Sequence, residues 1–387
     1  MGYKDKKYTK SITQQINDRL TKMLHDGEGV SKREARANGT DRDKIHSYST
    51  YENYYKHCKY FSKYLKDNHP EITNLKQAKK YVNEWLQYRV DNGNDKGEPL
   101  SAWTISLERQ ALCKLFGIDK DDPDFFKVPK RKRENIKRSR GNAARDKHFS
   151  ELNNEEFIEF CRGTGCRRQI MEKLEGRDLI SAEELMTMIQ DIGSKSELDS
   201  SSFEYFCNII KTQTSTYLDL PSFLKLSYVK LRKESGLSPK EINKLTSMIE
   251  ALSNFPDHEY FINHRSDKGG RYRYAPIIGE HKQQIIDRMR ATAPNEKVWL
   301  HVPGNADVHG YRSDYATMLY KKYARSIDQI PYDKVKKGTG IRYQSEVYAC
   351  RKDEKGKKLD KKAMFKASKA LGHNRLDVVA NNYIRGI

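Results

Sequence analysis

The sequence predicts a mostly helical protein with a small β-sheet, in which a helical N-terminal domain precedes a mixed α/β domain. Three observations support this fold class. Apolar residues recur at helical spacing along most of the chain, the stretches 259–265 and 271–277 alternate as strands around a turn, and a charged segment separates the two halves. We therefore divide the chain into a basic leader or arm (1–47), a helical domain (48–118), a basic linker (119–150) and a mixed α/β domain (151–387).

The composition favours a nucleic acid as partner. The 387 residues carry 73 Lys and Arg against 53 Asp and Glu, a net charge of +20, and such an excess attracts a polyanion. Aromatic residues make up 10% of the chain, which is enough for a true core. No apolar run approaches membrane-spanning length, and the N-terminus lacks the apolar core of a signal peptide. The six Cys are scattered without C-x-x-C pairs or zinc-site spacing, so we expect reduced thiols in a cytoplasmic protein.

The leader contains one predicted amphipathic helix, marked by Ile12, Ile16, Leu20 and Leu24. The turn-rich stretch 27–40 breaks that helix. We favour a flexible leader, and the alternative is an arm that contacts DNA outside the main site.

Three helices are predicted in the helical domain. The first carries a capping box at Ser49 and Glu52 and ends at His69-Pro70. The second follows Thr73 and ends at Gly93, and the third runs from about Ser101 to Phe116. Taken from the residues alone, this is a small helical module of undecided role.

The linker changes from acidic to strongly basic along its length. A charge run is most often a solvated surface, but this one joins two candidate DNA-binding domains, so we expect it to contact phosphates along a groove. Such contacts raise affinity without reading sequence. The predicted DNA-binding residues are Lys130, Arg131, Lys132, Arg133, Lys137, Arg138 and Arg140.

The mixed domain begins near residue 151 and contains a helical insert at about 180–256. Capping boxes at Ser181 and Glu184, and at Ser238 and Glu241, predict helix starts within the insert. The insert serves either protein contacts or flanking DNA, and the sequence leaves both open. The predicted hairpin that follows places Lys268 in its turn.

The remaining elements are helices with one charged turn. We expect a helix at 281–291, and another on which His309 and Arg312, three residues apart, share a face. The charged turn 352–357 joins two strands, or a strand and a helix. A helix at 361–370 follows, and then a short amphipathic helix, capped by Asn374, carries Leu376, Val379, Ala380 and Tyr383 on one face.

Four sequence boxes, in order, resemble those of the tyrosine recombinase (phage integrase) family, including its mobile-element integrases. Each box alone is weak, because short patterns recur by chance. They are Gly163-Thr164-Gly165-Cys166-Arg167, then the Asp267-Lys268 to Pro276-Ile277 hairpin, then His309-Gly310-Tyr311-Arg312, and last Leu371-Gly372-His373 followed ten residues later by Tyr383. The resemblance implies a SAM-like core-binding domain that clamps DNA and a mixed α/β catalytic domain.

The resemblance also implies a role for each matching residue. Tyr383 would be the nucleophile, Arg167 and Arg312 would clamp the phosphate, and His373 would hydrogen-bond it. Lys268 would protonate the leaving 5′-oxygen, and His309 would act in proton transfer on the tyrosine. Because an ordinary phenol has a pKa near 10, such a nucleophile needs cations beside it.

The sequence departs from the family at two places. The family usually has a Glu three residues after its first Arg, and here that position is Ile170, which puts a supporting hydrogen bond in doubt. In addition, 101 positions separate Arg167 from Lys268, several times the family's usual spacing.

The predicted function is therefore site-specific DNA recombination through a 3′-phosphotyrosyl intermediate. No metal, ATP or other cofactor is expected, since one ester replaces another and no P-loop pattern is present. The expected partner is double-stranded DNA with paired recombination sites, bound by a homo-tetramer that is a monomer when free. The protein is expected in the cytoplasm, associated with the nucleoid. Its gene is expected to belong to a prokaryote, a phage or another mobile element. The alternatives are a catalytically silent DNA-binding accessory protein of the same fold, a type IB topoisomerase, and a basic RNA-binding structural protein.

Overall fold

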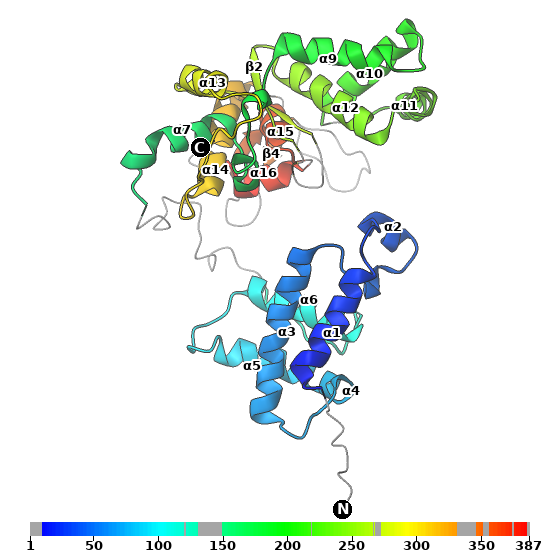
Figure 1. The fold of residues 1–387 in the computed structure, drawn as a ribbon, viewed down its shortest axis with the longest axis vertical. Helices are drawn as coiled ribbons and strands as arrows, with labels where there is room; N and C mark the ends of the chain where they lie inside the picture. Colours follow the sequence, from blue (N-terminus) through cyan, green and yellow to red (C-terminus); the bar gives the residue numbers. More distant parts are fainter. Residues whose placement is uncertain are drawn as a thin grey trace, which may run out of the picture. The chain divides into compact units, whose positions relative to one another are not determined.

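The computed structural model describes residues 10–119, 121–130, 149–217, 219–265, 267, 272–330, 346–350, 356–373 and 375–384 (Figure 1). Within these residues the protein is mostly helical, and its strands form small antiparallel sheets. This confirms the predicted fold class at its coarse level. The chain divides into two compact units, residues 1–138 and 139–387, and each is described by itself.

The first unit is a bundle of helices around one apolar core. Its helices are α1 (Ile12–His25), α2 (Lys32–Ala37), α3 (Tyr48–Asn68), α4 (Leu75–Ala78), α5 (Val82–Asn92) and α6 (Ala102–Phe116). The long helix α3 packs against both α1 and α6. The predicted end of the first helix near residue 69 agrees with the end of α3. The predicted third helix at 101–116 agrees with α6.

The expected flexible leader is instead part of this core. Ile16 and Leu20 on α1 are fully buried, and Ile45 is buried with them. The preference for a flexible leader is therefore wrong for the described residues up to 47. The apolar face of α1 has the helical spacing that we predicted, and α3 supplies the surface that covers it.

The start and end of two helices are set by single residues. Ser47, not Ser49, caps α3: its side chain accepts a hydrogen bond from the Thr50 backbone N–H, and Ser49 lies inside the first turn. The predicted capping box at Ser49 is wrong for that reason. Gly93 ends α5 as predicted, with φ of 75°, and a Cβ there would lie 2.1 Å from the Glu98 carbonyl oxygen.

The second unit combines a three-stranded sheet, a two-stranded sheet and, among its described residues, ten α-helices and three short 3-10 helices. Its strands are β1 (Leu179–Ser181), β2 (Tyr260–Asn263), β3 (Tyr274–Pro276), β4 (Val347–Ala349) and β5 (Lys358–Asp360). The larger sheet has the order β1-β2-β3, with Ile262 opposite Leu179 on one side and Ala275 on the other. The β4-β5 pair agrees with a charged turn between two strands.

The second unit has ten α-helices among its described residues. They are α7 (Glu155–Thr164), α8 (Arg168–Met171), α9 (Ala182–Ser194), α10 (Ser200–Ser215), α11 (Ser222–Glu234), α12 (Pro239–Asn254), α13 (Lys282–Ala291), α14 (Val308–Tyr323), α15 (Lys361–Ala370) and α16 (Leu376–Asn382). Helix α14 packs against α7 on one side and α15 on another.

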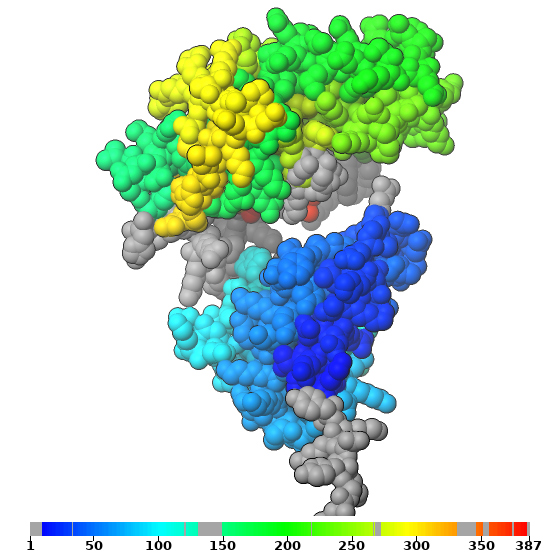
Figure 2. All heavy atoms as spheres, in the orientation of Figure 1, coloured from blue at the N-terminus to red at the C-terminus, as the bar shows by residue number. Residues whose placement is uncertain are grey.

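The insert forms the helices α9 to α12, which are green in Figure 2. Both predicted capping boxes are present, at Ser181 with Glu184 and at Ser238 with Glu241. Helix α12 packs against β3 and α15, and buried residues of the insert join those of α15 and α16 in one apolar cluster. The insert is therefore continuous with the core that holds the C-terminal helices.

Replacing Leu20 by Ala tests whether α1 belongs to the domain core. Leu20 is fully buried, so Leu20→Ala should lower the free energy of unfolding of the first unit by about 3 kcal/mol, from lost burial and the cavity left behind. Urea unfolding followed by circular dichroism measures this, with the exposed Lys22→Ala as the control, expected within about 0.5 kcal/mol of wild type. If both variants were equally stable, α1 would not belong to the domain core, and the segment would be a flexible leader.

Candidate functional site

The backbone of Tyr383, at the end of α16, is held against α14 by hydrogen bonds. The residue follows α16 directly, and its side chain is only 6% exposed. Its backbone carbonyl accepts hydrogen bonds from the hydroxyls of Ser313 and Thr317, the latter at 3.1 Å. Ser313 and Thr317 are one helical turn apart on α14, so they grip the same carbonyl from one face.

Three predicted site residues surround the Tyr383 ring. The His309 ring centroid lies 5.2 Å from that of Tyr383, edge to face, and the His373 centroid lies 5.0 Å away. The guanidinium carbon of Arg312 lies 5.8 Å from the centroid of the Tyr383 ring, within the range of a cation–π contact. The phenol is therefore in contact with a cation and two imidazoles.

Arg167 and Arg312 converge on one backbone carbonyl. Both donate to the Leu371 oxygen, Arg167 through Nη2 at 3.3 Å and Arg312 through its own Nη2. Arg312 is 2% exposed and also donates to the Gly165 carbonyl. Burial, with repulsion from Arg273 and Arg167, lowers the pKa of Arg312 to about 9, so it remains a cation at neutral pH.

Glycine at 165 is needed to bring Arg167 to this place. Gly165 ends α7 in the left-handed region, with φ of 59°. A Cβ there would lie 2.4 Å from the buried ring of Tyr315 on α14. The glycine thus lets the chain turn while α7 and α14 stay close, and Arg167 follows two residues later. Gly163 and Thr164, which open the same sequence box, lie in the last turn of α7.

Three residues that the sequence reasoning did not assign also belong to this cluster. Asp267 accepts hydrogen bonds from Arg167 and from Nε of Arg273, the latter at 3.1 Å. Arg273 also donates to the Ala370 carbonyl and, at 2.5 Å, to Nδ1 of His264. All three lie in or beside the predicted hairpin, but no spacing rule says which side chains of a hairpin turn inward.

Two histidines of the cluster, His373 and His264, have a lowered pKa and are neutral at neutral pH. Burial, followed by the positive charges of Arg312, Arg167 and Arg273, lowers the pKa of His373 to about 4. Burial and Arg273 lower the pKa of His264 well below its ordinary value. Two buried polar atoms, Nε2 of His373 and Nε of Arg312, have no hydrogen-bond partner among the described residues. Buried polar groups are normally paired, so these two nitrogens can still bond a group that enters the cluster.

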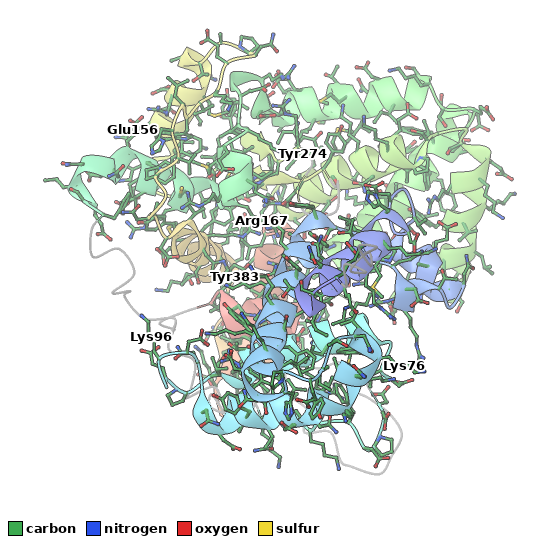
Figure 3. The ribbon with its side chains drawn as sticks, turned by 60° about the horizontal axis from the view of Figure 1, so that its bottom comes forward. Lys76, Lys96, Glu156, Arg167, Tyr274 and Tyr383 are labelled. Atoms are coloured by element: carbon green, nitrogen blue, oxygen red, sulfur yellow. The ribbon has the colours of Figure 1, made fainter. Side chains whose placement is uncertain are left out.

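The neighbouring Arg168 is engaged elsewhere. It donates to the carbonyls of Pro303, Gly304 and Ala306, which orders the segment leading into α14. Of the two adjacent arginines, the structure therefore places Arg167, not Arg168, in the cluster with Arg312. Figure 3 labels Arg167 and Tyr383 among the side chains of the second unit.

Some predicted site residues lie outside the described part of the chain. These are Lys268, the helix cap Asn374, and the linker residues Arg131, Lys132, Arg133, Lys137, Arg138 and Arg140. Lys130 is described and is exposed. The structure thus brings together Arg167, His309, Arg312, His373 and Tyr383, and Ile170 is buried in a separate apolar cluster, away from a supporting role.

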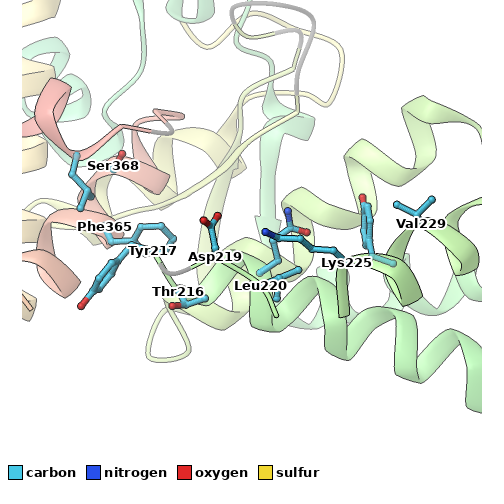
Figure 4. A pocket seen from close by; sticks show the side chains of 11 residues that line it. Thr216, Tyr217, Asp219, Leu220, Lys225, Val229, Phe365 and Ser368 are labelled. Atoms are coloured by element: carbon cyan, nitrogen blue, oxygen red, sulfur yellow. The ribbon is translucent and has the colours of Figure 1, made fainter. Parts of the chain in front are cut away.

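A hollow of about 660 Å³ lies beside this cluster but is not part of it. It is lined by Thr216, Tyr217, Lys225, Phe365 and Leu376, among others, from the insert, α15 and the start of α16 (Figure 4). None of the predicted site residues lines it, so the chemistry of the site does not depend on it.

Comparisons with known proteins leave the family of this chain unassigned. No protein-family model matches the sequence, and no curated protein matches it significantly. Within the described residues, no group of His, Cys, Asp or Glu is arranged to hold a metal ion. None of the described helices has the length and apolar character needed to cross a membrane.

The neutral His373 predicts a loss of stability in mild acid. Its pKa is about 4 when folded, against about 6.5 when unfolded, so the unfolded chain binds the proton first as the pH falls. Its stabilising contribution is complete above about pH 6.5 and is lost between about pH 6.5 and 4.

His373→Gln should therefore make the decline of unfolding free energy shallower in this range. The difference is at most about 1.4 kcal/mol per pH unit, for one proton. Urea unfolding at several pH values between 4.5 and 7.5 measures the slope, and the exposed His301→Gln is the control. Identical slopes for His373→Gln and wild type would contradict a neutral His373.

Proposed function

We propose that this protein is a tyrosine site-specific recombinase, which cuts and rejoins DNA through a 3′-phosphotyrosyl intermediate. The observation that carries the proposal is the setting of Tyr383. Its backbone carbonyl accepts from two hydroxyls of α14, its ring is flanked by His309 and His373, and the guanidinium carbon of the buried Arg312 lies 5.8 Å from the ring centroid. A core tyrosine without function needs packing, but it does not need a cluster of cations and imidazoles beside it.

The cluster supplies the binding site for one phosphodiester. Guanidinium groups suit phosphate because their N–H groups form a planar fork and their charge is permanent. Arg167 is partly exposed, and Arg312 and His373 each have a buried nitrogen without a partner among the described residues. A phosphate held by these three groups would have its phosphorus beside the Tyr383 hydroxyl.

The reaction then needs one nucleophile, one proton acceptor and one proton donor. The Tyr383 oxygen forms a bond to phosphorus while the bond from phosphorus to the 5′-oxygen breaks. The phenol proton passes to His309, and Lys268 gives a proton to the leaving 5′-oxygen. The 5′-hydroxyl of a partner strand reverses these steps and releases Tyr383. Charge that develops on the nonbridging oxygens is stabilised by Arg167 and Arg312.

The first unit and the linker would hold the DNA. In this proposal the first unit is a SAM-like core-binding domain, the second unit is the catalytic domain, and the basic residues from Lys130 to Arg140 contact the backbone. Exchange between two DNA sites needs four cleavages, so the active assembly is a tetramer on paired sites. A mobile-element integrase is the preferred form.

Covalent trapping tests the nucleophile and the chemistry together. We expect wild-type protein, incubated with nicked duplexes tiled from the DNA that flanks its gene, to form a protein–DNA adduct on a denaturing gel in the presence of EDTA. Tyr383→Phe should abolish the adduct, because it removes the attacking oxygen. Tyr348→Phe is the matched control, since Tyr348 is a partly buried tyrosine on β4.

The neighbouring arginines sharpen the same experiment. Arg167→Ala should slow adduct formation by about 100-fold or more, as expected for a lost transition-state contact. Arg168→Ala removes the same charge from a group that bonds only carbonyls in the described structure, and should act mainly through stability. Tight binding with no adduct for any protein would favour the silent accessory protein. Relaxation of supercoiled DNA without joining of two sites would favour a type IB topoisomerase, and a strict Mg²⁺ requirement for cleavage would count against the mechanism.

A further inference from the structure

We infer that Asp267 is the positioning residue for Arg167, a carboxylate that aims this guanidinium and occupies it until an anionic substrate arrives. The identity of the substrate, a phosphodiester, rests on the proposed function. The contact between Asp267 and Arg167 is observed independently of that function. Asp267 is the residue that directly precedes Lys268 in the sequence.

The geometry ties Arg167 to the hairpin. Asp267 is 6% exposed and accepts from Nη1 of Arg167, while Nη2 of Arg167 donates to the Leu371 carbonyl. The two terminal nitrogens of Arg167 thus have acceptors from two segments that are far apart in sequence. Ile170, at the position where the resembled family has its carboxylate, is apolar and buried in another cluster. Asp267, in the hairpin, supplies the carboxylate that is absent at position 170.

Arg273 fixes Asp267 in turn. Its Nε donates to Asp267 at 3.1 Å, its Nη1 donates to the Ala370 carbonyl, and its Nη2 donates to His264 at 2.5 Å. Each nitrogen of this buried guanidinium donates to an acceptor, so Arg273 is held in place as a structural cation. A Cβ at Gly372 would lie 2.9 Å from Cδ of Arg273 and 3.6 Å from Oδ2 of Asp267, so the segment carrying His373 packs on the same pair.

The charge balance gives Asp267 a second effect. Three guanidiniums, those of Arg167, Arg273 and Arg312, meet in this cluster, and Asp267 contacts two of them. An incoming phosphate has to compete with the carboxylate for Arg167. Removing the carboxylate charge should therefore favour simple anions, while it leaves Arg167 without its orienting partner. Anion affinity and reaction rate should change in opposite directions, which a merely structural ion pair would not produce.

The test compares Asp267→Asn, Asp267→Glu and wild type in the full chain. Titration with inorganic phosphate, followed by calorimetry, should show about threefold or greater tightening for Asp267→Asn, from one added unit of positive charge in a partly buried site. Asp267→Glu keeps the charge and should bind phosphate as wild type does. With saturating nicked DNA, the rate of adduct formation should fall about tenfold or more for Asp267→Asn, and Asp267→Glu should recover part of it.

The two readouts separate failure of this inference from failure of the proposed function. Unchanged phosphate affinity in a folded Asp267→Asn protein would overturn the inference, whatever the adduct rate. Tighter phosphate binding with a slower adduct supports it. If wild type forms no adduct at all, the proposed function fails, and the phosphate titration still decides for or against Asp267. Should Asp267→Asn not fold, Asp267→Glu decides alone: a slower adduct with phosphate binding like that of wild type would support a carboxylate that positions Arg167, and an adduct rate equal to that of wild type would overturn it.

Discussion

The buried guanidinium of Arg312 is the constraint on which the site depends. A cation taken out of water needs several acceptors, and Arg312 finds them in two segments that are distant in sequence. It donates to the carbonyl of Gly165 after α7 and to the carbonyl of Leu371 after α15, and its guanidinium carbon lies 5.8 Å from the centroid of the Tyr383 ring after α16. The requirement to satisfy one charge therefore holds the ends of α7 and α15 against α14.

The cluster around Arg312 carries an electrostatic cost that the fold offsets locally. Arg167 and Arg273 repel it, and the same positive field keeps His373 and His264 neutral. Asp267 and the carbonyls of Ala370 and Leu371 compensate part of this charge. Such a concentration of like charge weakens a core, so its presence in a packed interior favours a role in binding an anion over a role in stability.

The insert contributes to the site through packing. Residues 180–256 contain ten acidic and eight basic residues, a net charge of −2 in a chain of +20, so the excess positive charge lies elsewhere. Helix α12 packs against α15, and the apolar cluster of the insert includes Val379, Ala380 and Tyr383. We therefore regard the insert first as a support for the helices that carry Tyr383. This gives it a function that does not require contact with DNA.

The sequence by itself determined the local elements and the residue types of the site. Helical spacing, capping residues and strand alternation are read over a few neighbours, so the bounds of α6 and α15 and the start of α12 agreed with expectation. The ordered boxes selected Arg167, His309, Arg312, His373 and Tyr383. Only the tertiary structure decided which apolar faces meet, and so placed α1 in a domain core where a free leader was expected. It likewise turned Asp267, Arg273 and His264 inward, and separated Arg167 from Arg168. Those outcomes depend on contacts that local periodicity does not encode, such as Arg167 with Asp267, which are 100 positions apart, and α1 with α3.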